Sequence, residues 1–233
     1  MTFVKPQEGH PAFRLLREVA RGGAGTLYEA EDPQLGRRVA CKIFHRRAAD
    51  SDAIRNEARR TTALAGPGVV RLLDADPDAG YIAYEWLPLG SVRDAIAREE
   101  ATRLGPPDRW ATPIAVALAR VHRLGFVHGD VKPANILLAG WDLPLLADFG
   151  LTVPIGTAHL AGTPGYVSPE RLAGAVASPR DDVHAFGRML TEVIAASGQG
   201  TEAWLRLAAA CSGPFDERPR DGDALVEALR RPG

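Results

Sequence analysis

The sequence predicts an α+β fold in two parts, a small strand-rich part followed by a mainly helical part. Up to residue 86, short apolar runs alternate with turns rich in Asp, Gly and Pro, which is typical of strands. From residue 91 onward, apolar residues recur at helical spacing in runs bounded by capping residues and glycines. At 233 residues the chain has enough material for one large domain or two small ones.

The first part reads as three strands, a helix and two strands, with a turn over residues 32–36. The helix is expected because residues 51–65 contain neither Gly nor Pro and are rich in Ala, Arg and Glu. It ends at Gly66-Pro67, two residues that do not continue a helix. The expected strands are residues 13–20, 26–31, 38–44, 69–75 and 81–86.

The second part contains five expected helices. The first begins with Ser91 as N-cap and has Asp94 three residues later, near a capping-box position. The second repeats apolar residues at helical spacing and stops at Gly125. The five are residues 91–100, 113–124, 180–196, 201–210 and 221–231.

Composition limits the functional classes. The 28 basic and 29 acidic residues are balanced, so nothing indicates a nucleic-acid partner or an anionic membrane surface. The first ten residues lack the apolar stretch of a signal peptide, and no window approaches the ~20 apolar residues of a membrane span. Cys41 and Cys211 are too few for a disulfide framework, so a cytoplasmic location is expected. We expect Cys41 to be an ordinary strand residue that faces away from Lys42, rather than a thiol of lowered pKa.

Two short motifs carry four polar residues at the intervals that phosphoryl transfer from a nucleotide requires. Residues 128–135 read His-Gly-Asp-Val-Lys-Pro-Ala-Asn, and Asp-Phe-Gly follows at 148–150. In this chemistry one acid orients the attacking hydroxyl, a lysine neutralises charge on the moving phosphoryl group, and an asparagine and a second acid hold Mg²⁺. The matching residues, in that order, are Asp130, Lys132, Asn135 and Asp148.

Lysine is scarce in this chain, which uses arginine for nearly all of its 28 basic positions. The three lysines are Lys5, Lys42 and Lys132. Two of them lie within short motifs, Lys132 in the motif at 128–135 and Lys42 in Val-Ala-Cys-Lys at 39–42. A compact ammonium suits a crowded phosphate site, whereas the arginine fork suits surface ion pairs.

These motifs resemble those of the protein kinase family, in particular bacterial serine/threonine protein kinases. Residues 39–42 resemble the family's V-A-I-K strand, and residues 162–170 resemble the segment that ends in A-P-E. The Ala-, Arg- and Gly-rich composition also suggests a GC-rich bacterial genome. The resemblance implies a bilobal kinase fold, divided into an extension (1–12) and a kinase domain (13–231) with N-lobe (13–86), hinge (87–90) and C-lobe (91–231).

The resemblance implies ATP and Mg²⁺ as cofactors. Lys42 would contact the α- and β-phosphates, and Glu57 would fix it. Residues 85–87 resemble the hinge that pairs with adenine, and Tyr84 would wall the back of that pocket. Residues 20–28 resemble the glycine-rich G-x-G-x-x-G loop, with Ala20 in place of the first glycine. The implied ATP-binding residues are Ala20, Gly22, Gly25, Ala40, Lys42, Glu57, Glu85 and Leu87.

Further residues would shape the site and accept the substrate. The resemblance implies that Thr163 bridges Asp130 and Lys132, an arrangement that marks serine/threonine specificity. Asp182 would anchor the backbone of the catalytic loop. His128 is interpreted as a buried structural residue. The remaining implied contact is a buried structural ion pair between Glu170 and Arg218.

Besides Ala20, the chain departs from the family at three points. Gly129 replaces the arginine that pairs with an activation-loop phosphate in many kinases, and the segment from 151 to 167 is short. We therefore predict activity that does not require loop phosphorylation. Only 36 residues separate Asp182 from Arg218, so a helix between 196 and 201 is expected to be missing, as in a minimal catalytic domain. Thr61 stands where the family usually has an aliphatic residue.

The predicted function is ATP-dependent phosphoryl transfer to Ser or Thr hydroxyls of protein substrates. A small-molecule phosphotransferase is the first alternative, because His-Gly-Asp is also the catalytic triplet of aminoglycoside kinases. Lys132 and the segments at 148–150 and 168–170 favour a protein kinase. The second alternative is a pseudokinase or scaffold, which Ala20 and Thr61 favour and the presence of the other catalytic residues disfavours.

Overall fold

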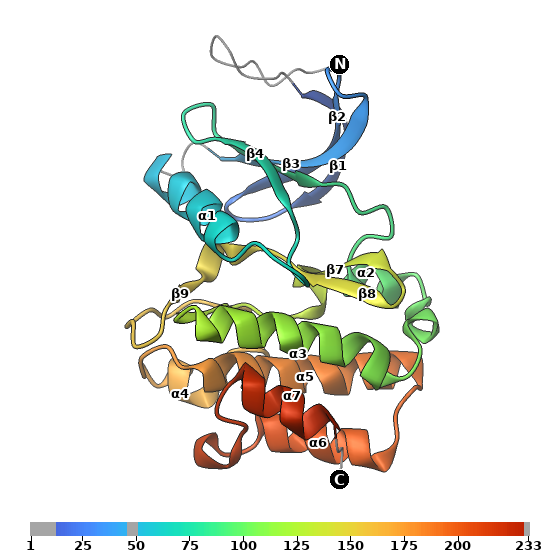
Figure 1. Ribbon diagram of the computed structural model, residues 1–233, viewed down its shortest axis with the longest axis vertical. Helices are drawn as coiled ribbons and strands as arrows, with labels where there is room; N and C mark the ends of the chain where they lie inside the picture. The colour runs from blue at the N-terminus through green and yellow to red at the C-terminus, as the bar shows by residue number, and fades with distance from the viewer. Residues whose placement is uncertain (1–12, 46–50, 231–233) are drawn as a thin grey trace. The chain divides into compact units, whose positions relative to one another are not determined.

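The computed structural model describes residues 13–45 and 51–230. The expected extension over 1–12 and the expected final residue, Arg231, lie outside the described residues. The chain divides into two compact units, whose elements are labelled in Figure 1. The N-terminal unit comprises the described residues up to Gly66 together with Val70–Leu87. The C-terminal unit comprises Pro67–Val69 and the described residues from Pro88 onward.

The N-terminal unit is a five-stranded antiparallel sheet with one helix packed against its strands β4 and β5 (Figure 1). The strand order is β1-β2-β3-β5-β4, so each hairpin pairs neighbours and β5 inserts beside β3. The predicted order of three strands, a helix and two strands is confirmed. The bounds are β1 (Arg14–Arg21), β2 (Gly25–Asp32), β3 (Arg37–Phe44), α1 (Ser51–Ala63), β4 (Leu72–Asp76) and β5 (Tyr81–Glu85).

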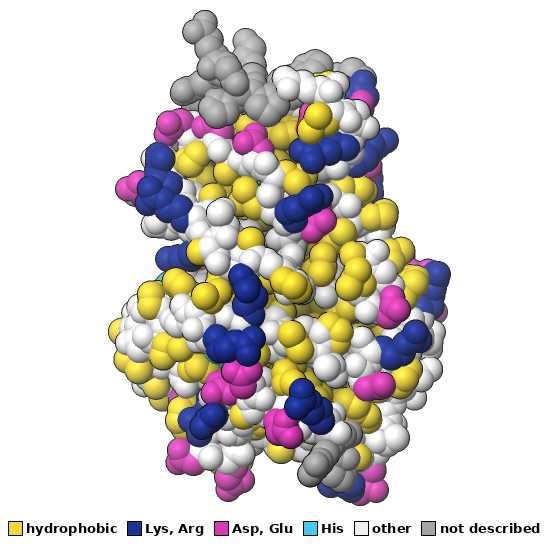
Figure 2. Space-filling view, viewed as in Figure 1, with side chains coloured by type: hydrophobic (Ala, Val, Ile, Leu, Met, Phe, Trp, Pro, Cys, Tyr) yellow, Lys and Arg dark blue, Asp and Glu magenta, His cyan; other side chains and the backbone are white. Residues whose placement is uncertain are grey.

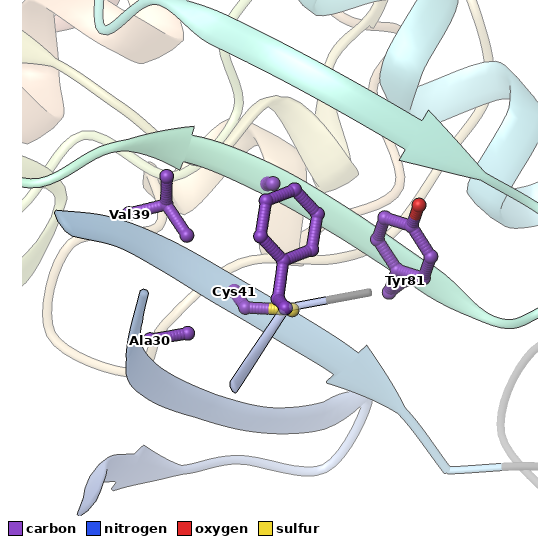
Figure 3. Close-up of a cluster of buried hydrophobic side chains, with 6 residues drawn as sticks. Ala30, Val39, Cys41 and Tyr81 are labelled. Atoms are coloured by element: carbon purple, nitrogen blue, oxygen red, sulfur yellow. The ribbon is translucent and has the colours of Figure 1, made fainter. Parts of the chain in front are cut away.

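One face of this sheet is covered by an apolar cluster. Figure 3 shows Val39 and Cys41 of β3 beside Ala30 of β2 and Tyr81 of β5, and all four are buried. Burial raises the pKa of the Cys41 thiol to about 12, and the negative charge of Asp74 adds to this effect. Cys41 is therefore a protonated core residue, and the expected alternation that turns it away from Lys42 is confirmed.

The C-terminal unit is mainly helical. Its long helices α3, α5, α6 and α7 run side by side, and the β7–β8 hairpin lies along α3 (Figure 1). The helices are α2 (Val92–Ala97), α3 (Pro107–Arg123), α4 (Pro169–Leu172), α5 (Pro179–Ser197), α6 (Glu202–Ser212) and α7 (Gly222–Arg230). The strands are β6 (Phe126–Val127), β7 (Ile136–Gly140), β8 (Leu143–Leu146) and β9 (Val153–Pro154). Short 3-10 turns occur at η1 (Ala101–Leu104), η2 (Pro133–Asn135), η3 (Phe149–Leu151) and η4 (Phe215–Glu217).

The prediction for α3 was wrong at its start. The helix begins at Pro107, which occupies the first helical position, and Pro113 lies inside it. Proline is favoured at the first position because its missing N–H needs no helical partner there. An internal proline gives up one hydrogen bond. Here the helix continues because its buried face, which includes Trp110 and Ile114, packs into the core.

The cap expected at the start of α2 and the direct connection expected after α5 are confirmed, but α2 ends at Ala97 and not at residue 100. Ser91 accepts a hydrogen bond from the Asp94 amide, and Asp94 reciprocates, which forms a capping box. Gly198 ends α5 in the left-handed region, and α6 starts at Glu202, so no helix separates the two. Gly187 of α5 allows their close packing, because a Cβ there would meet the Ala208 carbonyl oxygen at 2.7 Å.

The surface carries both signs of charge. On the face shown in Figure 2, Lys and Arg side chains are interspersed with Asp and Glu side chains over both units. Within the described parts of the chain, no helix has both the length and the apolarity needed to cross a membrane.

Candidate active site

Asp130 lies at the centre of a compact hydrogen-bonded cluster in the loop between β6 and β7. The Lys132 ammonium lies 2.6 Å from Asp130 Oδ2 and 2.6 Å from Thr163 Oγ1. Thr163 in turn donates from Oγ1 to Asp130 Oδ1 at 2.7 Å, and its amide donates to the same oxygen at 3.0 Å. The structure thus brings together three residues that lie up to 33 positions apart.

Asn135 and Asp148 present oxygen atoms of the kind that bind hard cations. Asn135 Nδ2 donates to the Asp130 carbonyl at 2.8 Å and to Asp130 Oδ2 at 3.0 Å, which orients the amide and leaves its oxygen as the ligand atom. Asp148 is exposed, and it lies in the left-handed region with φ +62°. Such a conformation in a non-glycine residue is uncommon and occurs often at functional sites.

This donor set fits Mg²⁺ bound together with a nucleotide. Among the described residues, no group of three or more His, Cys, Asp and Glu side chains could hold a metal ion. Mg²⁺ is commonly held by one or two protein ligands, with phosphate oxygens and water completing its shell. One amide oxygen and one carboxylate are sufficient for that arrangement.

Asp182 holds the backbone of the loop. Its carboxylate is 1% exposed, at the start of α5. Oδ2 accepts from the His128 amide at 2.7 Å and lies 2.9 Å from His122 Nε2, while Oδ1 accepts from the Gly129 amide at 2.9 Å. Burial alone would raise the pKa of Asp182, but the hydrogen bond and charge of His122, with the Gly129 amide, leave this pKa below its usual value.

His128 connects the motif at 128–135 to the motif at 148–150. The ring is fully buried, and its Nε2 lies 3.0 Å from the carbonyl of Ala147, the residue before Asp148. Its Nδ1 accepts from the Asp130 amide at 3.2 Å, so the proton of a neutral ring resides on Nε2. These contacts give His128 a structural role.

Gly129 cannot carry a side chain without a change of backbone. Its φ is +82°, and a Cβ would approach the Leu151 carbonyl oxygen to 2.9 Å. Thr152, the residue after Leu151, donates from Oγ1 to the His128 carbonyl at 3.2 Å. The segment after Asp148 is therefore packed directly on the loop that contains Asp130.

Glu170 and Arg218 form a bidentate ion pair, with N–O distances of 2.9 and 3.1 Å. The expectation of a buried pair is correct only for the arginine, whose side chain is 1% exposed against 28% for the glutamate. Burial raises the pKa of Glu170, but the hydrogen bond and charge of Arg218, a backbone hydrogen bond and the Ser168 side chain together lower this pKa below its usual value.

The N-terminal unit holds all eight residues that were predicted to bind ATP. Lys42 Nζ lies 2.7 Å from Glu57 Oε1, so these two are brought together. Ala40 lies two residues before Lys42 on β3. Glu85 closes the β4–β5 hairpin, since its carboxylate accepts from the Arg71 amide at 2.7 Å. Leu87 is the last residue of the unit.

The glycine-rich segment forms the turn between β1 and β2. Gly22 donates its amide to the Gly25 carbonyl at 2.9 Å, and Ala20 lies on β1 opposite Leu27. A Cβ at Gly25 would meet the Ile43 carbonyl oxygen at 2.5 Å. Glycine is therefore required at position 25 by the close approach of β2 to β3.

Sequence reasoning missed two contacts of the site. His122, on α3, contacts Asp182, and its Nδ1 accepts from the Gly222 amide at 2.8 Å. The Tyr84 hydroxyl donates to Glu57 Oε1 at 3.0 Å. A lone histidine in an apolar helix was the only available signal for the first contact, and no sequence signal pointed to the second.

Known proteins share extensive sequence similarity with this chain. Residues 13–199 match the family profile of the protein kinase domain. The chain is 36% identical over 201 residues to the DNA damage-responsive serine/threonine-protein kinase RqkA of Deinococcus radiodurans, a match that covers 79% of this chain and 30% of that protein. It is 32% identical to the serine/threonine-protein kinase pkn2 of Myxococcus xanthus, over 78% of this chain and 24% of the relative.

A third relative is the serine/threonine-protein kinase PknL of Mycobacterium tuberculosis, 32% identical over 76% of this chain and 47% of the relative. The matches thus span between 24% and 47% of the length of these three relatives. The family match covers well over half of the chain, and it includes the lysine strand, the catalytic loop and the Asp-Phe-Gly segment. This chain therefore belongs to the protein kinase family.

Proposed function

We propose that this chain transfers the γ-phosphoryl group of ATP to serine or threonine hydroxyls of protein substrates. The observation that carries the proposal is the cluster of Asp130, Lys132 and Thr163. A buried carboxylate here accepts a hydrogen bond from an alcohol at 2.7 Å, beside an ammonium at 2.6 Å. An incoming Ser or Thr hydroxyl presents the same chemical group as Thr163.

In the proposed reaction, the acceptor oxygen forms a bond to the γ-phosphorus, and the bond from that phosphorus to the ADP oxygen breaks. Asp130 orients the acceptor and takes up its proton. Lys132 neutralises charge that spreads over the phosphoryl oxygens. Mg²⁺ held by Asn135 and Asp148 would neutralise the charge of the phosphates.

The N-terminal unit would supply the nucleotide contacts. Lys42, fixed by Glu57, would pair with the α- and β-phosphates. The backbone of the turn that follows Ala20, with Gly22 and Gly25, would approach phosphate oxygens without side-chain obstruction. The remaining contacts, to adenine, would come from Ala40, Glu85 and Leu87.

We also propose that activity does not require phosphorylation of the segment from 151 to 167. Gly129 offers no cation for a loop phosphate, and its φ of +82° with the nearby Leu151 carbonyl disfavours any side chain. Thr163 is already bound to Asp130 through both its amide and its hydroxyl. A phosphatase-treated sample should keep its activity, and loss of nearly all activity after that treatment would refute this proposal.

The acceptor class is tested by offering several acceptors. Purified protein is incubated with Mg·[γ-³²P]ATP and either a mixed protein acceptor, an aminoglycoside or a simple alcohol. We expect label on Ser and Thr of protein, located by mass spectrometry, as the names of the relatives suggest. An Asp148→Asn variant serves as the control for contaminating kinases. Label on the small molecules alone would favour a small-molecule phosphotransferase.

A further inference from the structure

Helix α1 has a buried face that is unusually polar. Its buried residues are Ile54, Glu57 and Thr61, which lie on one side of the helix at spacings of three and four. Only one of these three is apolar. Because apolar burial is the main term that fixes a surface helix to a sheet, α1 depends strongly on hydrogen bonds.

Those hydrogen bonds converge on Glu57. The fully buried Thr61 hydroxyl donates to the Glu57 carbonyl at 2.9 Å, a bond that stays within the helix. The Glu57 carboxylate, in contrast, binds two side chains of the sheet. Lys42 Nζ lies 2.7 Å from Oε1, and the Tyr84 hydroxyl donates to the same oxygen at 3.0 Å. A carboxylate oxygen can accept both bonds at once.

The two donors come from the same face of the sheet. Tyr84 of β5 pairs with Ala40 of β3, and Ile82 pairs with Lys42, so directly opposed residues place Lys42 and Tyr84 on one face. The neighbours Cys41 and Tyr81 belong to the apolar cluster of the other face (Figure 3). The alternation of β5 therefore separates a tyrosine of the core from a tyrosine that serves the ion pair.

The environment makes the Tyr84 bond strong. Tyr84 is 8% exposed and Glu57 is 5% exposed. A buried carboxylate needs compensation for its lost hydration, and a hydrogen bond to a charged group stabilises more than one between neutral groups. Lys42 provides one donor to this oxygen, and the phenol provides a second.

We infer that Tyr84 is a positioning residue for phosphoryl transfer. Its hydroxyl holds Glu57, and through Glu57 it holds both α1 and the Lys42 ammonium in the arrangement that the reaction uses. The predicted effect of Tyr84 on the reaction rests on the proposed function. Tyr84 itself acts through Glu57.

The test is the Tyr84→Phe variant, which removes one oxygen and keeps the ring. Tyr81→Phe is the matched control, because it removes a buried hydroxyl from the same strand, there bonded to Asp74 at 2.8 Å on the opposite face. We expect Tyr84→Phe to lower kcat/KM for ATP about ten-fold, in line with loss of one hydrogen bond to a charged group. The KM for the protein substrate should stay unchanged, and Tyr81→Phe should leave both constants near wild type.

Two further measurements separate positioning from general support of the fold. Amide hydrogen exchange of the nucleotide-free protein should be faster in α1 of Tyr84→Phe, with the exchange in α5 unchanged. In a Glu57→Ala background, which removes the acceptor of the Tyr84 hydroxyl, Tyr84→Phe should have almost no additional effect on kcat/KM.

Every outcome of these experiments either supports or overturns the inference about Tyr84. If wild-type protein transfers no phosphate, the proposed function fails, and the exchange of α1 alone judges the Tyr84 inference. If wild type is active and Tyr84→Phe matches it in kcat/KM and in exchange, the inference is overturned. The inference is also overturned if Tyr84→Phe causes the same loss in the wild-type and Glu57→Ala backgrounds, or if the Tyr84→Phe chain does not fold. In both cases the hydroxyl would support the fold as a whole.

Discussion

The loop around Asp130 and the pair of Lys42 and Glu57 are held in place in very different ways. The loop is bound on several sides, by Asp182 from α5 and by Thr163 from the segment that follows Asp148. The Lys42–Glu57 pair connects β3 to a helix with one buried apolar residue, and the phenol of Tyr84 reinforces it.

This contrast indicates where stability and activity can be separated. Side chains that anchor the loop satisfy buried backbone amides, so their loss leaves unpaired groups in the core. Side chains that hold Glu57 act mainly on the placement of one ammonium. We therefore expect loss of a side chain that anchors the loop to alter folding, and changes at Glu57 to alter the reaction with little effect on folding.

The largest effect on stability is expected for Asp182→Asn. The asparagine amide group would face the donors of His128, Gly129 and His122, so buried donors would oppose each other. We expect the free energy of unfolding to fall by about 3–5 kcal/mol, measured by urea denaturation. Asp223→Asn, an exposed acid at the start of α7, is the control and should change it by less than about 1 kcal/mol. An Asp182→Asn variant as stable as the control would contradict the anchoring role.

A change in the Lys42–Glu57 pair should alter the rate of phosphoryl transfer. We expect Glu57→Gln to slow phosphoryl transfer about 10- to 100-fold, because the charged partner of Lys42 is lost. Its free energy of unfolding should change by less than about 1.5 kcal/mol. Asp52→Asn, an exposed acid on the same helix, should leave the rate unchanged. A Glu57→Gln protein that keeps the full rate would remove the distinction between the two regions.

The smallest effect concerns pH. His184 of α5 is buried, and burial, followed by the charge of Arg218, lowers its pKa. As the pH falls, the unfolded chain therefore takes up a proton at this residue near pH ~6.5, whereas the folded protein does so only at a lower pH. The contribution of His184 to the free energy of unfolding is fully present above that pH. It is lost as the pH falls from there through the lower pKa of the folded state.

A His184→Gln variant should therefore show a weaker decline of the unfolding free energy between about pH 7 and pH 5. His159→Gln, which changes an exposed histidine, should keep the wild-type decline. Identical pH profiles for His184→Gln and wild type would show that this histidine does not titrate differently on folding.

Local patterns in the sequence predicted much of the fold and the site. Residues 128–135 predict a chemistry by themselves, because the roles proposed for Asp130, Lys132 and Asn135 depend on spacing within one loop. Strand alternation placed Cys41 correctly, and the spacing of Ser91 and Asp94 predicted the cap of α2.

Features set by distant packing could not be predicted in this way. The contact of His122 with Asp182 joins residues 60 positions apart, and the bond from Tyr84 to Glu57 joins residues 27 positions apart. Strands β6 and β9 have two residues each, too few to show a period. Pro113 suggested a helix boundary, but core packing overrides that local preference.

The central claim is that Asp130 orients a Ser or Thr hydroxyl for phosphoryl transfer. Its most direct test is the rate of ³²P transfer from Mg·ATP to protein by Asp130→Asn, with folding checked by thermal unfolding. We expect the rate to fall about 10²- to 10⁴-fold while the chain stays folded. A folded Asp130→Asn protein that transfers phosphate at the wild-type rate would contradict the claim.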